Sequence, residues 1–371
     1  MPAELPVVDG QVLLPAKGIT ELIKTIFVRA GGSESEANDI SLHLVEATAS
    51  GHDSHGIIRV PRYLEALANG HVSFGKLPVP VMESDNFVLF EGSHGFGQTL
   101  GKKATEYGIK KAQAHGVALV GLRNSGHIGR IGAWAEQACA ANIVSVHFVN
   151  VSGALLVAPF GGAGRRMSTN PIAVGVPNAG GDDFVLDFAT SRVAEGKVLV
   201  AQKAGKQVDA ACLVDGEGQA TGDPLALYGQ VAKGQVPDPR EGAGALTPMG
   251  EHKGSGLSLA CELLAGALTG SGTSGPGGRV HNGMLSVFVD PTVMDDGHAW
   301  AKSVSEYIDY VRSCPAAKSV DAVLIPGDPE RQARKHRIQQ GIPLDEQSFA
   351  DIISAAEKLG LSEDASLAIL Q

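Results

Sequence analysis

The chain has 371 residues, and its 30 Lys and Arg residues against 40 Asp and Glu residues give a net charge of −10. This acidic balance, without any block of basic residues, argues against nucleic acid or an anionic membrane as a partner. With 43% hydrophobic and 19% charged residues, the chain is too apolar to be disordered. Its 48 glycines are nearly twice the ordinary share of about 7%, which predicts many sharp turns or close approaches of the backbone to a ligand.

Cysteine usage and the N-terminus indicate the compartment. The four cysteines are far apart and form no CxxC pair, so we expect neither a disulfide framework nor a cysteine-ligated zinc site, but a reducing environment. Residues 1–11 lack the basic and apolar regions of a signal peptide, and no run of apolar residues is long enough to span a bilayer. The expectation is a cytoplasmic globular protein.

The first part of the chain has the pattern of helices. Residues 19–27 carry apolar side chains at i, i+3, i+4, i+7 and i+8, which is one stripe of an amphipathic helix. A Ser-x-x-Glu capping box begins a second helix over residues 33–51, and a third short helix is expected over 61–70. Between them, residues 52–56 are expected to be a loop, where side chains are free to do chemistry.

From about residue 85 onward, short apolar runs typical of strands alternate with helical segments. The strands are expected at residues 87–90, 117–122, 143–149, 172–176, 185–188, 284–289 and 321–325. The helices are expected at residues 99–115, 130–141, 191–203, 253–269, 298–313, 329–340 and 345–369. The helix over 253–269 has almost no charge and is expected to be buried on most faces. The Gly-, Pro- and Asp-rich segment 204–250 is expected to be loop with one strand at 211–214.

These elements predict a mixed α/β fold with a central sheet domain and a helical domain built from both ends of the chain. We expect an N-terminal helical segment over residues 1–80 and the sheet domain over 81–297. A C-terminal helical segment over 298–371 is expected to pack with the N-terminal one.

The stretch Gly95–Gly101 follows an expected strand and opens a helix, which is superficially the dinucleotide-binding fingerprint. Its third glycine is one residue late, and the next strand ends in Arg123 and Asn124, where an acidic residue should bind the ribose. The stretch also follows a long helical segment instead of opening the domain. We therefore reject a Rossmann fold and interpret the stretch as a helix N-terminus packed closely on the sheet.

The first candidate for chemistry is the segment 52–63, which brings Ser54, His55, Arg59 and Tyr63 close together in sequence. Histidine exchanges protons near neutral pH, and arginine presents a planar fork that suits a carboxylate. The serine and tyrosine hydroxyls can orient a neighbouring carbonyl or hydroxyl group. Two other interpretations stay open: a linking loop whose polar side chains cap helices, and a metal site built from its histidines and aspartate.

The second candidate is Asn124–Arg130, which contains His127 between glycines. It lies at the carboxyl end of an expected strand and before a helix, where α/β proteins gather ligand-binding groups. A plain glycine turn with a helix-capping serine is the alternative. Two histidine-bearing glycine loops favour one shared site, although spacing alone does not show that they meet.

Further polar segments follow strands later in the chain. The turn 167–171 succeeds a glycine loop, and Asp187–Ser191 puts an acid at a strand end and hydroxyls at an expected helix start, where amides bind anions. Lys253 lies near a helix N-terminus, an unfavourable position for a cation unless it binds an anionic ligand such as a pyrophosphate. The turn 326–329 is placed to close over a ribose.

Several short motifs occur in one order along the chain. They are Asp53-Ser-His-Gly56 with Arg59, Pro61 and Tyr63; Gly126-His-Ile-Gly129; Pro159-Phe-Gly-Gly162; Thr169-Asn-Pro171; Asp187-Phe-Ala-Thr190; Lys253-Gly-Ser-Gly256; and Pro326-Gly327. Together they resemble the malate/L-lactate/L-sulfolactate dehydrogenase family, the type-2 group that includes ureidoglycolate dehydrogenase, 2,3-diketo-L-gulonate reductase and Δ1-piperideine-2-carboxylate reductase. The similarity runs from about residue 18 to 360.

The resemblance implies an NAD(P)-dependent oxidoreductase of the EC 1.1.1 type, with a nucleotide-binding fold distinct from the Rossmann fold. It also implies a homodimer whose sites are built from both subunits. Members move a hydride between the nicotinamide and C2 of a small acid, so we expect a 2-hydroxy-acid dehydrogenase of the malate or lactate type. A reductase of a cyclic imino acid, Δ1-piperideine- or Δ1-pyrroline-2-carboxylate, is the alternative, and a catalytically silent nucleotide-binding protein is a third.

By position, the resemblance assigns proton transfer to His55 and His127 without ranking them. It implies that Arg59 holds the substrate carboxylate, with Ser54 and Tyr63 beside it. No metal is implied. The implied cofactor-binding residues are Thr169, Asn170, Asp187, Phe188, Ala189, Thr190, His252, Lys253, Gly327 and Asp328.

Two details differ from the family or stay open. Ser168 precedes Thr169 where many members have glycine, a change that affects at most the local turn. The choice between NAD and NADP depends on a few residues around the ribose 2′ position, and Arg165, Arg166 and Arg192 are each candidates for binding a phosphate there.

Overall fold

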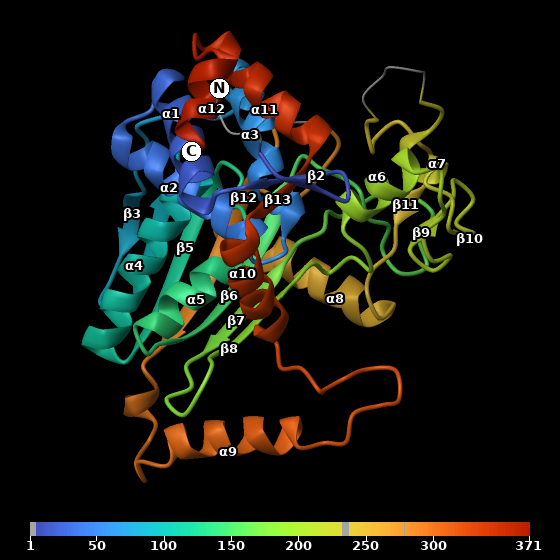
Figure 1. The fold of residues 1–371 in the computed structure, drawn as a ribbon. Helices are drawn as coiled ribbons and strands as arrows, with labels where there is room; N and C mark the ends of the chain where they lie inside the picture. Colours follow the sequence, from blue (N-terminus) through green and yellow to red (C-terminus); the bar gives the residue numbers. More distant parts are fainter. Residues whose placement is uncertain (1–4, 232–236, 278) are drawn as a thin grey trace.

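A seven-stranded sheet with strand order β3-β4-β5-β12-β6-β7-β8 forms the centre of the structure, a computed structural model that describes residues 5–231, 237–277 and 279–371 (Figure 1). The strands are β3 (Val79–Glu83), β4 (Phe87–Glu91), β5 (Val117–Ser125), β6 (Val144–Ser152), β7 (Ile172–Val176), β8 (Phe184–Phe188) and β12 (His281–Val289). Strands β4 and β5 pair in parallel, and the other neighbouring pairs of this described sheet are antiparallel. The predicted mixed α/β fold, distinct from the parallel Rossmann sheet, is confirmed.

Helices cover both faces of this sheet. On one face lie α4 (Gly97–His115) and α5 (Gly132–Ala140) (Figure 1). Gly108 of α4 packs so closely that a Cβ would lie 2.3 Å from the ring of Phe288 on β12. A Cβ on Gly283 of β12 would instead meet the Ala265 carbonyl oxygen of η3 (Glu262–Leu268). Because residues 283 and 288 point to opposite faces of a strand, η3 covers the other side of the sheet.

The glycine stretch at residues 95–101 brings α4 against the loop after β5. A Cβ on Gly97 would lie 2.3 Å from the carbonyl oxygen of His127, and one on Gly101 would lie 2.8 Å from the Trp134 ring. Only glycine permits these approaches. The prediction of a helix N-terminus packed closely on the sheet is confirmed.

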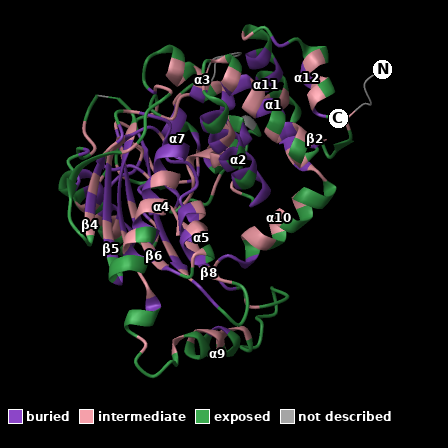
Figure 2. Ribbon diagram, turned by 90° about the vertical axis from the view of Figure 1, so that its left-hand side faces the viewer, coloured by how far each residue is buried: buried purple, intermediate pink, exposed green. Residues whose placement is uncertain are grey.

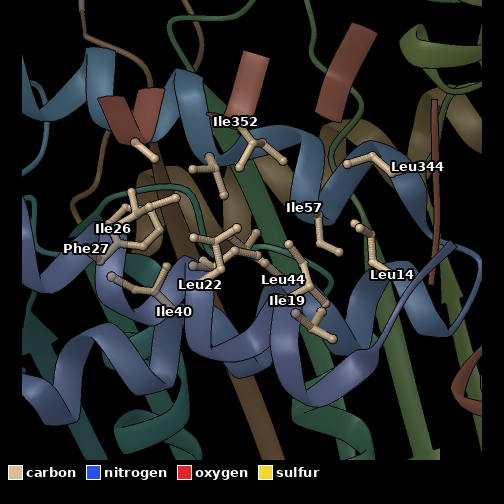
Figure 3. Packing of buried hydrophobic residues seen from close by; sticks show 14 of the residues in the cluster. Leu14, Ile19, Leu22, Ile26, Phe27, Ile40, Leu44, Ile57, Leu344 and Ile352 are labelled. Carbon is tan, nitrogen blue, oxygen red and sulfur yellow. The ribbon is translucent and has the colours of Figure 1, made fainter. Parts of the chain in front are cut away.

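The two ends of the chain share a second hydrophobic core, in which residues of the N-terminal and C-terminal elements are buried together. Its elements are β1 (Val7–Val8), β2 (Gln11–Leu14), α1 (Ala16–Arg29), α2 (Glu34–Ala49), α3 (Val60–Ala68), β13 (Ile342–Asp345), α11 (Glu346–Lys358) and α12 (Glu363–Ile369). Leu22 and Phe27, from the predicted stripe, are buried with Leu344 and Ile352 (Figure 3). The domain boundaries stay predictions.

A third, smaller core joins the segment expected to be mostly loop to residues 195–203 and to the chain around Val157 and Met167. Its elements are α6 (Glu195–Lys203), β9 (Leu213–Val214), β10 (Ala220–Thr221), α7 (Leu225–Tyr228) and β11 (Ala245–Leu246). The Arg165 guanidinium donates hydrogen bonds to four carbonyl oxygens here, those of Leu227, Pro239, Gly242 and Gly244. These bonds hold the segment in place. Because they occupy the guanidinium, Arg165 is no longer a candidate for binding a 2′-phosphate.

The C-terminal part differs from the prediction in two places. Residues 321–325 form no strand, because β8 reaches this segment through a single bond, from the Val185 amide to the Pro326 carbonyl oxygen. The expected helix over 345–369 is two helices, α11 and α12, separated by Gly360 at φ +77°. The short strands β2, β3 and β13 were not predicted.

Two further helices complete this part, α9 (Trp300–Arg312) and α10 (Asp328–Gln340). Figure 2 shows α9 as largely exposed and apart from the sheet. Helix α10 packs on α2, and its Arg331 Nη1 donates to the carbonyl oxygen of Asp183, the residue before β8. Within the described residues, no helix combines the length and apolar character that crossing a bilayer requires.

The predicted burial of the helix over 253–269 is wrong for this chain. Helix α8 (His252–Cys261) continues into η3, where the backbone takes π-helical geometry. Leu259, Leu263 and Leu268 are 53%, 53% and 64% exposed. The absence of charge predicted an apolar helix but not which of its faces the chain itself covers.

Candidate active site

The two histidine motifs meet in space. His55 lies in the short 3-10 helix η1 (Asp53–His55) between α2 and α3, and His127 follows the end of β5. Their imidazole rings stack with centroids 5.6 Å apart and an angle of 20° between the planes. The two segments therefore form one site.

The loop that carries His55 is fixed on α2 and closed by Arg59. A Cβ on Gly56 would overlap the hydroxyl of Thr48, which also accepts a hydrogen bond from the Ile57 amide at 2.9 Å. Ser54 Oγ lies 3.0 Å from His55 Nδ1, and Arg59 Nε donates to the Ser54 carbonyl oxygen at 2.5 Å. Among the described residues the guanidinium makes this bond through Nε alone, so its two terminal amino groups are available to a ligand.

Tyr63 and Gln98 hold His127. The Tyr63 hydroxyl lies 2.7 Å from His127 Nδ1, and Gln98 Nε2 donates to that hydroxyl at 2.9 Å and to the His127 carbonyl oxygen at 3.1 Å. Burial raises the pKa of Tyr63 to about 12, so its hydroxyl stays protonated at neutral pH. Gln98, only 1% exposed, comes from the glycine stretch on α4 and was missed in the sequence.

Both histidines are neutral at neutral pH. Burial, and after it the positive charge of Arg59, lowers the pKa of His55 to about 3. The same two causes lower the pKa of His127 well below its ordinary value. An anion bound at Arg59 would cancel part of that charge and raise both pKa values. Such an arrangement links carboxylate binding to proton uptake by a histidine.

The expected cofactor residues around positions 169 and 190 lie side by side. The Thr190 amide donates to the Thr169 carbonyl oxygen at 2.9 Å, and its hydroxyl donates to the Asn170 carbonyl oxygen at 3.0 Å. Helix α6 begins only at Glu195, so the expectation that these hydroxyls start a helix is wrong. The Asn170 side chain is fully buried and donates to Glu262 at 2.8 Å, so it is engaged within the protein.

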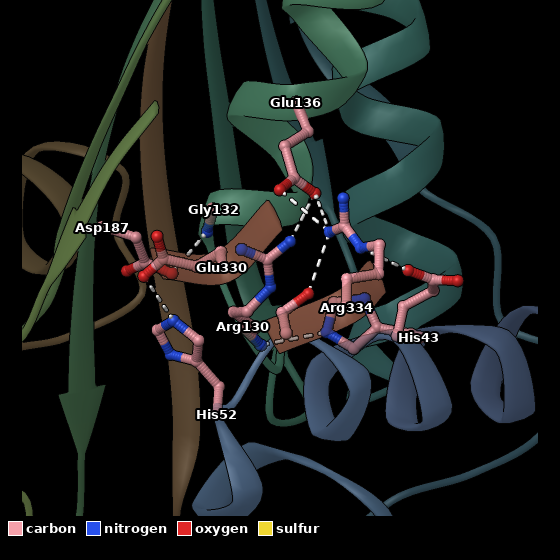
Figure 4. A network of polar contacts seen from close by, with 10 residues as sticks. His43, His52, Arg130, Gly132, Glu136, Asp187, Glu330 and Arg334 are labelled. Carbon is pink, nitrogen blue, oxygen red and sulfur yellow. Dashed lines mark hydrogen bonds and ion pairs between the residues drawn. The ribbon is translucent and has the colours of Figure 1, made fainter. Parts of the chain in front are cut away.

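Asp187 lies at the end of β8 within a network of charged groups (Figure 4). Its Oδ2 accepts a hydrogen bond from the Gly132 amide at 2.8 Å. Burial raises the pKa of Asp187, although the neighbouring His52 and Arg130 act in the opposite direction. His52 Nε2 lies 3.2 Å from Glu330 Oε1, which connects the histidine loop to α10.

Arg130 is the buried cation of this network. It is 2% exposed and pairs with Glu136, which also accepts from Arg334 at 3.0 Å. Its Nε and Nη1 have no hydrogen-bond partner in the part of the chain that the structure describes. A Cβ built on Gly132 would lie 2.7 Å from Arg130 Nη1 and 2.8 Å from Asp187 Oδ2, so the cation and the carboxylate face the same point. Such buried donors suit a polar ligand.

His252 and Lys253 begin α8 and are exposed. The Met249 amide donates to the Thr190 carbonyl oxygen at 2.9 Å, which brings the start of α8 beside the half-buried Phe188 and Ala189. The cation, the helix N-terminus and the end of β8 are thus neighbours.

Gly327 and Asp328 lie where Pro326 pairs with Val185, at the start of β8. Gly327 precedes α10 with φ +99°. Arg312 and Arg331 donate to the Asp328 carboxylate at 2.8 and 2.6 Å. Burial alone would raise the pKa of Asp328, but the Ile325 amide and these guanidinium groups outweigh it and lower the pKa. This carboxylate is therefore engaged within the protein.

The side chains of the first loop diverge instead of converging on a metal ion. His52 contacts Glu330, Asp53 pairs with Arg337 and His55 contacts Ser54. In residues 5–231, 237–277 and 279–371, no group of three or more His, Cys, Asp or Glu is placed to hold a metal. Two surface cavities, of about 780 and 380 Å³, lie near the chain termini and between α3 and α11, away from the histidine pair.

Comparison with known proteins gives a consistent assignment. A model of the malate/L-lactate dehydrogenase family matches residues 14–353. Hydroxycarboxylate dehydrogenase B of Escherichia coli K12 is 36% identical over 363 residues, 96% of this chain and 97% of that protein. The Δ1-pyrroline-2-carboxylate/Δ1-piperideine-2-carboxylate reductase of Pseudomonas putida is 31% identical over 352 residues, 93% of this chain and 97% of that one.

The fold agrees with these sequence matches. The solved structure of sulfolactate dehydrogenase from Methanocaldococcus jannaschii aligns with a TM-score of 0.83 at 31% identity, covering 95% of this chain and 98% of that one. The resemblance carried by the motifs is thereby confirmed. The chain belongs to the malate/L-lactate dehydrogenase family.

Proposed function

We propose that the protein is an NAD(P)-dependent 2-hydroxy-acid dehydrogenase of the EC 1.1.1 type that also works in reverse as a 2-oxo-acid reductase. The observation that carries the proposal is the stacked pair His55 and His127 beside Arg59. A proton-exchanging pair next to a carboxylate-binding fork is what reduction at C2 of a small malate- or lactate-like acid requires. Membership of a family named for such dehydrogenases supports the same reaction class.

In this proposal Arg59 orients the substrate through its carboxylate, with the Ser54 and Tyr63 hydroxyls beside it. The carboxylate offsets the charge of Arg59, so the pKa of the histidine pair rises as the substrate binds. In the reductive direction a protonated histidine donates to the oxygen on C2, and in the oxidative direction a neutral histidine accepts that proton. The bound nicotinamide supplies or accepts the hydride.

The residues around Asp187 fit a dinucleotide cofactor. The two unpartnered donors of buried Arg130 and the carboxylate of Asp187 suit a polar group, and Lys253 at the start of α8 suits a pyrophosphate. Thr169 and Thr190 fix the neighbouring turn. Phe188, Ala189, His252 and Gly327 stay in the proposed cofactor site, while Asn170 and Asp328 contribute by holding its backbone.

We also propose a cytoplasmic homodimer whose sites are completed by the partner. The exposed leucines of α8 and η3 support this, because three large apolar side chains on one helical segment are a surface that association would cover. The four cysteines, all free, suit a reducing compartment.

A reductase of a cyclic 2-imino acid is the second candidate function. The similarity to the Pseudomonas putida reductase over 93% of this chain favours it. Arg59 and a histidine proton donor serve an imine carboxylate as well as a 2-oxo acid, so substrate turnover separates the two functions.

The test follows the absorbance of NADH and of NADPH with pyruvate, oxaloacetate, sulfopyruvate, a diketo-gulonate and Δ1-piperideine-2-carboxylate. We expect turnover of at least one 2-oxo acid, whereas turnover of the imine alone would establish the second candidate. His55→Ala and His127→Ala should each abolish turnover while cofactor binding, followed by fluorescence, persists. Cofactor binding without turnover of any substrate would instead identify a catalytically silent nucleotide-binding protein, and near-normal rates in both variants would remove the histidine assignment.

A further inference from the structure

The glycine stretch at residues 95–101, which resembles a dinucleotide-binding fingerprint, contacts the histidine site. Gly97 allows α4 to touch the backbone of His127, and the next residue, Gln98, reaches both that carbonyl oxygen and the Tyr63 hydroxyl. Since a carbonyl oxygen only accepts, the nitrogen of the Gln98 amide must face it, which fixes the amide orientation. The same nitrogen therefore donates to Tyr63.

The direction of this bond determines the next one. Tyr63 is 7% exposed, and its oxygen already accepts from Gln98 at 2.9 Å, so its own proton needs an acceptor. His127 Nδ1 lies 2.7 Å away. If Nδ1 carried a proton, both neighbours would donate to the Tyr63 oxygen and its buried O–H would have no acceptor. Nδ1 must accept, and the neutral ring then carries its proton on Nε2.

We propose that Gln98 is a positioning residue that, through Tyr63, holds His127 as the Nε2-protonated tautomer and so presents an N–H to the reacting oxygen of the substrate. This proposal rests on the proposed function for its substrate but not for the tautomer. It also gives the stacked histidines different roles, since His55 Nδ1 faces a serine hydroxyl, which either donates or accepts. His55 is then free to change its protonation state, whereas His127 is fixed as a hydrogen-bond donor.

The test substitutes Gln98 and reads the tautomer directly. An ionised carboxylate at this position only accepts, so in Gln98→Glu, measured above the pKa of that carboxyl, the Tyr63 hydroxyl turns toward residue 98 and Nδ1 of His127 becomes the protonated nitrogen. Gln98→Leu removes the donor without adding an acceptor and should give a mixture of tautomers. Thr99→Val is the matched control, because Thr99 is the next residue, equally buried, and its hydroxyl has no hydrogen-bond partner in the described chain.

The readout is the pair of imidazole 15N resonances of His127 in protein labelled with 15N-histidine, assigned by their loss in His127→Gln. We expect an unprotonated Nδ1 in the wild type and in Thr99→Val, and a protonated Nδ1 in Gln98→Glu. In a Tyr63→Phe background, Gln98→Glu should leave the tautomer unchanged, because the connecting hydroxyl is gone. A wild type protonated on Nδ1, or a folded Gln98→Glu variant with the wild-type tautomer, would overturn the proposal.

A kinetic readout connects the tautomer with turnover. The charged and titratable groups that act on His127 are Arg59, His55, Arg62 and His43, with Tyr63 in contact. All of them persist in Gln98→Leu, which adds no charge, so a shift of its pH–kcat profile, with unchanged cofactor affinity, reports the changed tautomer; a lower Tm with an unshifted profile would mean that Gln98 is only structural. The NMR readout needs no substrate, so the two proposals can fail separately. His127 protonated on Nε2 without turnover of any substrate would refute the proposed function alone. Turnover by an enzyme whose His127 is protonated on Nδ1 would refute the role of Gln98 alone.

Discussion

Removal of Arg59 is the substitution with the largest expected effect on substrate recognition. In Arg59→Met, the two terminal amino groups that face the ligand disappear, while the apolar stem is largely kept. Each hydrogen bond between a guanidinium and a carboxylate contributes about 1.5–3 kcal/mol, so losing two of them lowers kcat/KM about 10²- to 10⁴-fold. The cofactor lies elsewhere in the proposed site, so its KM should change little.

The same substitution has a second consequence, on protonation. Of the neighbouring charged groups, Arg59 has the largest effect on the pKa values of His55 and His127, and it lowers both. Without it both pKa values rise, so the variant should take up its catalytic proton at a higher pH than the substrate-free wild type. The measurement is the pH dependence of kcat/KM for the acid, together with the KM of each nicotinamide cofactor.

Two control variants make this result specific. Arg62→Gln removes an exposed arginine three residues along the chain, whose charge lowers the pKa of His127 less than that of Arg59 does, and should keep kcat/KM within about threefold. Arg59→Lys retains the charge without the planar fork and should fall between the wild type and Arg59→Met. An Arg59→Met enzyme with wild-type kcat/KM and an unshifted pH profile would refute the assignment of Arg59 to the substrate carboxylate.

Three further predictions concern stability and assembly. His147 is fully buried, which lowers its pKa to about 3. Below about pH 6.5 the unfolded chain binds a proton at this residue and the folded chain does not, so the free energy of unfolding should fall by about 2 kcal/mol between pH 8 and pH 5. Urea unfolding of His147→Asn should lack that share of the pH dependence. Arg165→Met removes the side-chain hydrogen bonds to four carbonyl oxygens, of which that of Leu227 keeps the bond from the Gly242 amide, and should cost roughly 2–4 kcal/mol, with proteolysis starting in residues 204–250; an unchanged protease pattern would contradict its role as a clamp. Leu263→Glu charges the exposed apolar face of η3 and should convert a dimer to a monomer in light scattering, while a variant that stays dimeric would move the interface elsewhere.

The fold class and the candidate site residues could be predicted from the sequence because both depend on local patterns. Periodic apolar residues marked α1, and the position of Ser54, His55 and Arg59 within a motif marked a candidate substrate loop. The burial of the helix over 253–269 was not readable, since a lack of charge does not say which face another surface covers. The prediction of a strand at 321–325 was wrong because a strand needs a neighbouring strand to pair with, which local sequence does not specify.

The contacts between the site residues could not be predicted from the sequence. His55 and His127 are 72 positions apart and meet because His43 of α2 and Tyr63 of α3 contact the loop after β5. Gln98 carries no motif of its own and lies in a stretch that was set aside as structural. The glycines around it gave the only available signal, because they mark where the backbone comes close to something; what it approaches is the backbone of His127.

The proposed function depends on hydride transfer between a nicotinamide and C2 of a small acid. It is tested most directly by incubating the wild-type protein with 4-deuterated NADH or NADPH and the 2-oxo acid it turns over, and locating the label in the product by mass spectrometry and NMR. We expect one deuterium at C2 of the 2-hydroxy acid, from one face of the nicotinamide only, and loss of this transfer in His55→Ala. A product that forms without label at C2 would contradict it.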